Sequence, residues 1–172
     1  MVVETQAAEM AASGLMSSIL ANGGNVLAAI GAFLAVAISG LGSAKGMGIA
    51  ASAASGVTAE NEKYFSKVLA LQALPQTQVI YGFVIGLIIL WGINSGELTI
   101  EQGWICIPAG LTVGIAGLSA THQGKVAAAG IGGVARNPGI LAKALILGVM
   151  PEFVAILGFV TALFMLVFSG IL

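Results

Sequence analysis

The stretch VMPEFVAILGFV, residues 149–160, places a single glutamate, Glu152, inside a long apolar segment. No other charged residue occurs between Ala144 and the C-terminal Leu172. A carboxylate in hydrocarbon is costly and is expected only where it has polar partners or takes part in moving ions. Glu152 is therefore the first candidate functional residue, and the apolar segment that carries it is long enough to predict a membrane-spanning helix.

The composition of the whole chain indicates an integral membrane protein. Of its 172 residues, 58% are hydrophobic and only 8% are charged, against about 25% charged in soluble domains. The lipid bilayer is therefore the expected surrounding. The net charge is -1 and no basic run occurs, so neither nucleic acid nor an anionic membrane surface is an expected partner. The lone Cys106 cannot form an internal disulfide and is expected to be a buried apolar thiol.

Four stretches are apolar over about 20 residues or more, the length that a helix needs to cross the hydrocarbon core. They cover approximately residues 25–51, 68–93, 104–129 and 143–171. These runs are too long for barrel strands and do not alternate. We therefore expect an all-α membrane protein with four transmembrane helices. It divides into an N-terminal extension (1–24), a first hairpin (25–93), an extracytoplasmic connection (94–103) and a second hairpin (104–172).

The distribution of charge predicts the orientation of these helices. Every basic residue lies in or beside the first connection (55–67) or the third (130–139): Lys45, Lys63, Lys67, Lys125, Arg136 and Lys143. The middle connection and the N-terminus carry only acidic charges: Glu4, Glu9, Glu97 and Glu101. By the positive-inside rule the hairpin loops are cytoplasmic and both termini are outside. Trp91 and Trp104 flank the middle connection, where an outer aromatic belt would place them.

The two hairpins repeat each other in sequence. Residues 74–84, LPQTQVIYGFV, align without gaps with residues 150–160, MPEFVAILGFV. Upstream, residues 38–46, ISGLGSAKG, resemble residues 115–125, IAGLSATHQGK. The repeat is parallel, because both hairpins have the same predicted orientation. Gln76 stands in the place of Glu152, so the chain has one membrane carboxylate per four helices.

Small residues predict close helix packing. The pairs Gly42/Gly46, Gly82/Gly86 and Gly110/Gly114 have the G-x-x-x-G spacing that lets helix backbones approach each other in lipid. Residues 40–56, GLGSAKGMGIAASAASG, carry small residues on every side of the first helix, more than one partner helix would use. This pattern favours an inner helix of a homo-oligomeric ring. A compact monomeric four-helix bundle is the simpler alternative.

A polar face occurs in the middle of the second span. Leu74, Thr77, Gln78 and Tyr81 are spaced i, i+3, i+4 and i+7, which places them on one side of a helix. Gln123 adds a further amide in the third span. Oxygen donors grouped about one carboxylate are what a hard cation requires once its water is removed, whereas a proton requires only the carboxylate.

Each of these polar residues, and each proline near them, also has a simpler explanation. Pro75 and Pro151 each remove a backbone hydrogen bond within a span, and such prolines can be plain kinks. For any single polar side chain an interhelical hydrogen bond, worth about 0.6 kcal/mol in membrane helices, is the simpler role. The same holds for His122, which we expect to be a polar helix contact.

At this point the sequence resembles a known family, the proteolipid rotor subunit (the c or K subunit) of V-type and A-type rotary ATPases. The likeness is to its duplicated four-helix form and especially to its sodium-translocating members. It covers the chain from Asn25 onward and rests on four segments: GSAKG (42–46), LPQTQVIYGFVI (74–85), QGKVAAAGI (123–131) and PEFVAILGFV (151–160).

The resemblance implies an ion site. One Na⁺ per subunit would be held by the carboxylate of Glu152, by three side chains and by one backbone carbonyl, with a phenol hydrogen-bonded to the carboxylate. On this sequence those groups are the side chains of Thr77, Gln78 and Gln123, the carbonyl of Leu74, and Tyr81. In proton-using relatives the carboxylate remains while parts of this polar shell are usually missing, so H⁺ is the alternative coupling ion. No organic cofactor is implied.

The resemblance also implies a function and partners. Several copies would form a ring, with the first and third helices inside, that carries ions past a stator membrane subunit containing half-channels. The cytoplasmic loops would attach to a central-stalk subunit. No nucleotide motif occurs, so the chain is expected to be a non-catalytic ion-translocating subunit, and one carboxylate per four helices favours a pump over a synthase. The rival class is a small cation or drug antiporter, which the parallel repeat and 6% aromatic content disfavour.

Overall fold

The computed structural model describes the backbone of residues 2–172 and the side chains of residues 10–18 and 22–172. Met1 and the side chains of Glu4 and Glu9, part of the expected N-terminal extension, lie outside the described residues. Within the described part every regular element is helical: α1 (Val2–Glu60), α2 (Phe65–Gln72), α3 (Thr77–Ser95), α4 (Ile100–Gly117), α5 (Ala120–Arg136), α6 (Leu141–Val149) and α7 (Glu152–Phe168). Short 3-10 turns lie between α1 and α2 (Glu62–Tyr64), between α2 and α3 (Leu74–Gln76) and between α5 and α6 (Pro138–Ile140).

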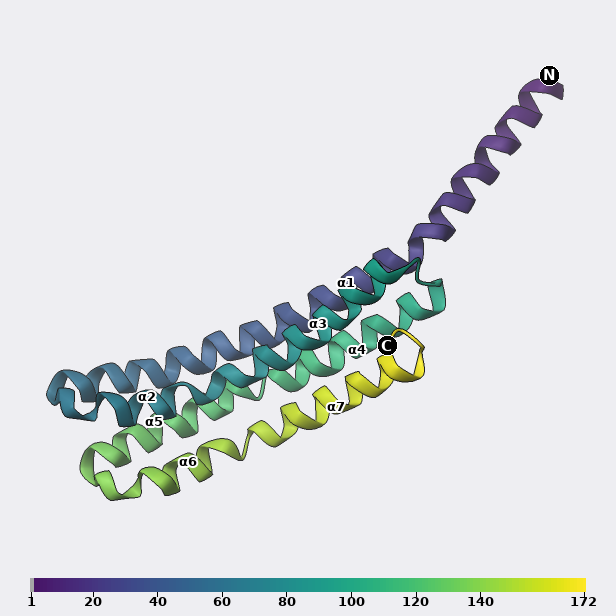
Figure 1. The fold of residues 1–172 in the computed structure, drawn as a ribbon. Coiled ribbons are helices and arrows are strands. Elements are labelled where there is room, and N and C mark those ends of the chain that lie inside the picture. Colours follow the sequence, from purple (N-terminus) through teal and green to yellow (C-terminus); the bar gives the residue numbers. More distant parts are fainter. Residues whose placement is uncertain (1) are drawn as a thin grey trace.

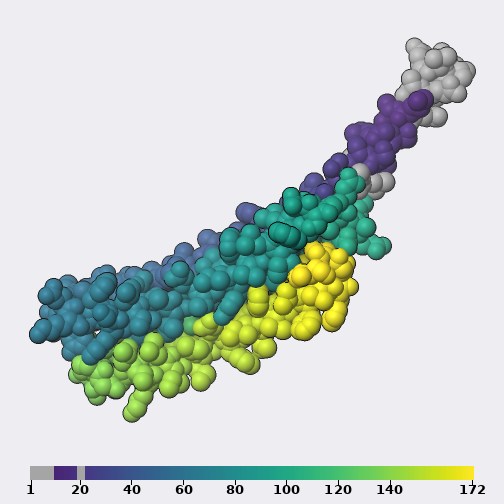
Figure 2. Space-filling model, viewed as in Figure 1, coloured from purple at the N-terminus to yellow at the C-terminus, as the bar shows by residue number. Residues whose placement is uncertain are grey.

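These elements form four long rods that run side by side, except that the N-terminal part of α1 projects beyond one end of the bundle (Figure 1). The rods cover residues 10–60, 62–95, 100–136 and 138–168, and each is long and apolar enough to cross a membrane. The expected all-α fold with four spans is therefore confirmed. Figure 2 shows the second hairpin, green to yellow, lying along the first, blue to teal.

The hairpin turns are tighter than the sequence suggested. Residues 55–67 were expected to connect the first two spans, but α1 continues to Glu60 and the chain reverses at Asn61, whose side chain accepts a hydrogen bond from the Lys63 amide. The third connection, expected over 130–139, likewise shortens because α5 continues to Arg136. Polar residues can continue a helix into water, where their side chains and the backbone groups at the helix end are solvated.

Three of the four rods are interrupted near mid-length. The second rod breaks at the turn that contains Pro75, and the fourth breaks at Met150 and Pro151. Proline has no amide hydrogen and its ring clashes with the preceding turn, which accounts for both breaks. The third rod breaks at Leu118 and Ser119, whose amides bond carbonyls three residues back, as in a 3-10 turn.

Glycines bring the first and third rods into backbone contact. A Cβ atom on Gly110 would overlap the carbonyl of Gly31, and one on Gly124 would overlap the carbonyl of Gly46. Gly103 and Gly117 extend the same stripe along the third rod at seven-residue intervals and also lie against the first rod. Such close approach is how small residues stabilise helix pairs in lipid. The first and third rods therefore form the tightly packed centre of the molecule.

The second and fourth rods pack on this centre in equivalent ways. Gly82 of α3 faces Ala35 and Ser39 of α1, and Gly158 of α7 faces Thr112 and Ala116 of α4. The offsets are 77 for the inner rods (112 minus 35, 116 minus 39) and 76 for the outer rods (158 minus 82). The repeat seen in the sequence is therefore a repeat of packing as well.

Side chains tie together the end of the bundle opposite the hairpin turns. The Leu98 amide donates to Asn25 Oδ1 at 3.0 Å, and Gln102 Nε2 donates to the Ser169 carbonyl at 3.2 Å. The middle connection, the start of the bundled part of α1 and the C-terminus therefore meet at one end (Figure 1). Both hairpins consequently run in the same direction, while their direction relative to the membrane stays a prediction.

Two features near this end bear on the expectations from the sequence. Trp91 and Trp104, which flank the middle connection, are 73% and 59% exposed in the single chain, and their place in an outer aromatic belt stays a prediction. Cys106 is fully buried in the core between the hairpins, as predicted for an apolar thiol.

Candidate functional site

Glu152 begins α7, directly after the break at Pro151, and is almost fully buried. Its two carboxylate oxygens have different partners. Oε1 accepts a 2.6 Å hydrogen bond from the Tyr81 hydroxyl, and Oε2 lies 3.4 Å from the donating Nε2 of Gln123. The buried carboxylate is thus held by the second and third rods while it is itself carried by the fourth.

Two amides continue this network. Gln78 Nε2 donates to Gln123 Oε1 at 2.5 Å, and both glutamines are fully buried. Gln123 therefore uses both ends of its amide, because it accepts from Gln78 and donates to Glu152. Buried amides are expected to be paired in this way, since an unpaired one costs about 1–3 kcal/mol.

Three oxygens lie close together on the other side of Gln78. Thr77 Oγ1 is 3.1 Å from the Leu74 carbonyl oxygen and 3.3 Å from Gln78 Oε1. A hydroxyl has one hydrogen, so it satisfies only one of these two acceptors at a time. The second rod thus gathers a carbonyl, a hydroxyl and an amide oxygen at its break, with acceptor capacity to spare.

The break in the second rod brings these groups close to one another. Pro75 interrupts the helix, and the new helix α3 starts at Thr77, which leaves the first amides of α3 without partners inside their own helix. One of them, the Val79 amide, donates to Ser43 Oγ of α1 at 3.1 Å. Ser43 therefore acts as a cap supplied by another helix, at the residue that follows Gln78.

Two residues that support the site had no role assigned to them from the sequence. Ser43 lies within the GSAKG segment, and the signal for it was a hydroxyl in an apolar span. Phe159 packs against the ring of Tyr81, with the ring centroids 5.4 Å apart. In the sequence, Phe159 stands out only as part of the Gly-Phe-Val that both repeats share, and this match by itself indicates only duplication.

The structure brings together all six residues that were expected to form the site: Glu152, Gln123, Gln78, Thr77, Leu74 and Tyr81. His122, next to Gln123, is exposed and lies outside the cluster, as does Gln76, the repeat equivalent of Glu152. In the described part of the chain no three His, Cys, Asp or Glu side chains are grouped as metal ligands. The donors are instead one carboxylate with neutral oxygens, a set that suits a hard cation.

Comparison with known proteins matches the chain to one family model twice. The model is that of the ATP synthase C subunit, and it matches residues 30–89 and 107–165. The two segments correspond to the two hairpins, and together they cover more than half of the 172 residues.

Individual relatives resemble the chain over most of its length. The A-type ATP synthase subunit K of Methanocaldococcus jannaschii is 44% identical over 142 residues, which cover 83% of this chain and 62% of the relative. The V-type sodium ATPase subunit K of Enterococcus hirae is 42% identical over 150 residues, 87% of this chain and 95% of the relative. The 16 kDa proteolipid of the Homo sapiens V-type proton ATPase is 26% identical over 137 residues, 79% of this chain and 88% of the relative.

Proposed function

Because the chain belongs to the ATP synthase C subunit family, we propose that it is a rotor-ring subunit of a V- or A-type ATPase. Each copy binds one Na⁺ at Glu152 and carries it across the membrane as the ring rotates, coupled to ATP hydrolysis or synthesis in a soluble head. The chain itself is non-catalytic. The name of the 42% identical relative, a sodium ATPase subunit K, supports the choice of ion.

The cluster of oxygens around Glu152 is the observation that carries this proposal. One Na⁺ would take the carboxylate of Glu152, the side-chain oxygens of Thr77, Gln78 and Gln123, and the carbonyl of Leu74. Tyr81 would remain the donor that orients the carboxylate. A proton needs only a carboxylate, whereas a desolvated Na⁺ needs several oxygen ligands, and four further oxygen donors lie beside this carboxylate.

Burial explains how the site alternates between holding and releasing its ion. An unpaired charge in a low-dielectric surrounding is heavily penalised, so Glu152 must be neutralised by a bound cation whenever its rod faces lipid. Beside a polar half-channel in a stator subunit the carboxylate can remain charged for long enough to release the ion. Rotation of the ring then converts this alternation into transport.

The ends of the bundle supply the contacts with other subunits. Lys63, Lys67 and Arg136 lie at the hairpin turns, whereas Glu97 and Glu101 lie at the opposite end. By the positive-inside rule the turns face the cytoplasm, where they would attach to a central-stalk subunit, and both termini are extracytoplasmic. The stator subunit would contact the outer rods, which carry the carboxylate.

Equilibrium binding of ²²Na⁺ to the purified protein in detergent tests this function. We expect one Na⁺ per chain at saturation and none in Glu152→Gln. Glu97→Gln, the same chemical change at an exposed residue of the middle connection, is the matched control and should bind normally. An absence of Na⁺ binding in the unmodified protein would assign H⁺ as the coupling ion. A purified protein no larger than a dimer in detergent would contradict the ring.

A further inference from the structure

The side chain of Tyr81 contacts the fourth rod at both of its ends. Its hydroxyl donates to Glu152 Oε1 at 2.6 Å, and its ring packs against that of Phe159, with the centroids 5.4 Å apart and the planes tilted by 35°. Glu152 and Phe159 are seven positions apart (159 minus 152), which is about two helical turns, so they lie on the same side of α7. One helix therefore holds the phenol by its polar end and by its ring.

The ring contact bears on the hydrogen bond because Tyr81 is only partly buried at the boundary between the two outer rods. Its hydroxyl reaches Glu152 only while the ring keeps one orientation, and a change of side-chain rotamer would carry the hydroxyl away. Phe159 is also partly buried, and both rings pack against the same core cluster between the hairpins. Phe159 is therefore in a place to keep the Tyr81 ring from turning.

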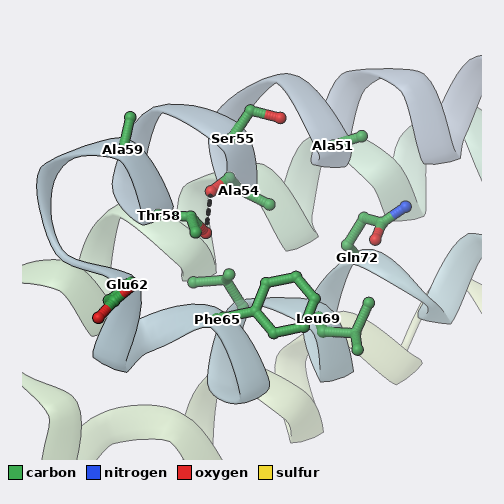
Figure 3. A pocket seen from close by; sticks show the side chains of 10 residues that line it. Ala51, Ala54, Ser55, Thr58, Ala59, Glu62, Phe65, Leu69 and Gln72 are labelled. Carbon is green, nitrogen blue, oxygen red and sulfur yellow. Dashed lines mark hydrogen bonds between the residues drawn. The ribbon is translucent and has the colours of Figure 1, made fainter.

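Phe159 differs from the other phenylalanines of the chain. The other six are 51–82% exposed: Phe33, Phe65, Phe83, Phe153, Phe164 and Phe168. Phe65, for example, lines an open cavity of about 450 Å³ beside Ala54 and Thr58 (Figure 3). Phenylalanine is stable against lipid without a protein partner. The inward place of Phe159 is therefore not a general property of phenylalanine in this chain, and it coincides with the contact to Tyr81.

The internal repeat supplies a comparison within the same molecule. With the offset of 76 for the outer rods, Phe159 corresponds to Phe83 (159 minus 76) and Tyr81 to Leu157 (81 plus 76). Phe83 and Leu157 are 51% and 53% exposed. Duplication thus accounts for a phenylalanine at position 159 but not for its contact with a tyrosine. That contact occurs where the second rod meets the carboxylate, and among the described residues no other aromatic pair joins two rods.

We infer that Phe159 is a positioning residue for the ion site: its ring holds the Tyr81 hydroxyl on Glu152 while the ion is bound, and thereby sets how fast the ion leaves. The inference rests on the proposed function. Release requires the carboxylate to change its partners, and a Tyr81 ring that is free to turn gives up its hydrogen bond more often. Phe159 has no polar side-chain atom, so it acts on the ion through its neighbours, of which Tyr81 is the one that bonds the carboxylate.

The rate of ²²Na⁺ release from the purified protein tests this role, measured by rapid filtration after addition of excess unlabelled NaCl. Phe159→Leu removes the ring and keeps an apolar side chain, and we expect release about threefold to tenfold faster, the size expected for loss of an aromatic pair. Phe83→Leu, the same change at the equivalent position of the repeat, should release Na⁺ at the unmodified rate. Phe159→Tyr keeps the ring and should restore slow release. Equal rates in Phe159→Leu and Phe83→Leu would overturn the inference.

A double-mutant cycle separates positioning from simple packing. Tyr81→Phe has no hydroxyl to hold on Glu152, so adding Phe159→Leu to it should change the release rate little. The combined effect should then be clearly smaller than the product of the two single effects. A loss of packing in the core would instead add the same factor in both backgrounds. Single effects that multiply in the double variant would overturn the positioning role of Phe159.

A second measurement works without Na⁺ and keeps the two proposals apart. Carbodiimide labelling of Glu152 in Na⁺-free buffer should be faster in Phe159→Leu than in the unmodified protein, because a freely turning Tyr81 covers the carboxyl less, and unchanged in Phe83→Leu. If Phe159→Leu fails to fold, Phe159→Met, of similar size and without a ring, takes its place. An unmodified protein that bound no Na⁺ would overturn the proposed coupling ion alone. Equal labelling rates in the Phe159 variant and the unmodified protein would overturn the role of Phe159.

Discussion

The Tyr81 hydroxyl donates a 2.6 Å hydrogen bond to Glu152 Oε1 across the boundary between the two hairpins. The two residues are 71 positions apart in the chain. The second rod thus supplies Thr77, Gln78 and the Leu74 carbonyl, and also the group that orients the carboxylate of the fourth rod. Single substitutions of the site residues, and of the residues that hold them in place, measure what each one contributes to Na⁺ binding and to stability.

Tyr81→Phe should weaken Na⁺ binding. The substitution keeps the ring contact with Phe159 and removes only the hydrogen bond to Glu152. Hydrogen bonds to charged groups are worth about 1.5–3 kcal/mol, so we expect an affinity lower by at least about tenfold. Titration with ²²Na⁺ measures this. Tyr64→Phe, near the first hairpin turn, is the control and should be unchanged, and equal affinities in the two variants would show that Tyr81 does not orient the carboxylate.

Gln123→Leu should abolish Na⁺ binding and lower the thermal unfolding midpoint. The substitution removes one oxygen donor and takes away the partner of Gln78 Nε2 and that of Glu152 Oε2, at about 1–3 kcal/mol for each unpaired group. Circular dichroism during heating reports stability, and isothermal titration with NaCl reports binding. Gln72→Leu makes the same change away from the cluster. A Gln123→Leu protein that still bound Na⁺ normally would remove Gln123 from the site.

Ser43→Ala should destabilise the start of α3 and with it the site. Its hydroxyl oxygen accepts the Val79 amide in the first turn of that helix, and the loss of a helix cap costs about 0.5–2 kcal/mol. We expect a lower unfolding midpoint together with weaker Na⁺ binding, because Thr77 and Gln78 lie in the same turn. Ser52→Ala removes a hydroxyl that bonds only its own helix. If both serine variants behaved alike, Ser43 would have no special role.

Gly110→Ala should separate the first and third rods. A Cβ at this position overlaps the carbonyl of Gly31, and overpacking of this kind costs about 1–3 kcal/mol. Gly132→Ala is the matched control, since a Cβ there meets no atom within 4 Å. It should leave stability unchanged or raise it, because alanine favours helix over glycine by about 1 kcal/mol. The difference between the two unfolding midpoints checks the close contact.

The sequence predicted the fold well because lipid imposes simple rules on it. Four apolar runs of sufficient length required four helices, and the repeat of residues 74–84 at 150–160 required two similar hairpins. Helical spacing alone placed Leu74, Thr77, Gln78 and Tyr81 on one side of a helix; the structure has the last three on α3 and Leu74 in the 3-10 turn just before it. The place of Gln123 beside Glu152 was implied by the family resemblance, since spacing says nothing about groups on different helices.

Contacts that depend on how helices are rotated against each other were not predictable in this way. The Ser43–Val79 and Asn25–Leu98 hydrogen bonds join segments that no local pattern relates. The glycine pairs signalled close packing, but not that Gly110 would meet Gly31. The predicted hairpin turns were too wide because polar composition is typical of loops, whereas here polar residues continue the helices beyond the apolar core.

The most direct test of the central claim is carbodiimide labelling of Glu152 in membranes across pH, with Na⁺ or an equal concentration of K⁺. The reagent attacks the protonated carboxyl, so a bound Na⁺ should protect it. Protons compete with Na⁺ for the same carboxylate, and we therefore predict strong protection by Na⁺ that weakens as the pH falls, with no labelling in Glu152→Gln. Labelling of Glu152 at the same rate in Na⁺ and K⁺ at every pH would contradict a sodium site.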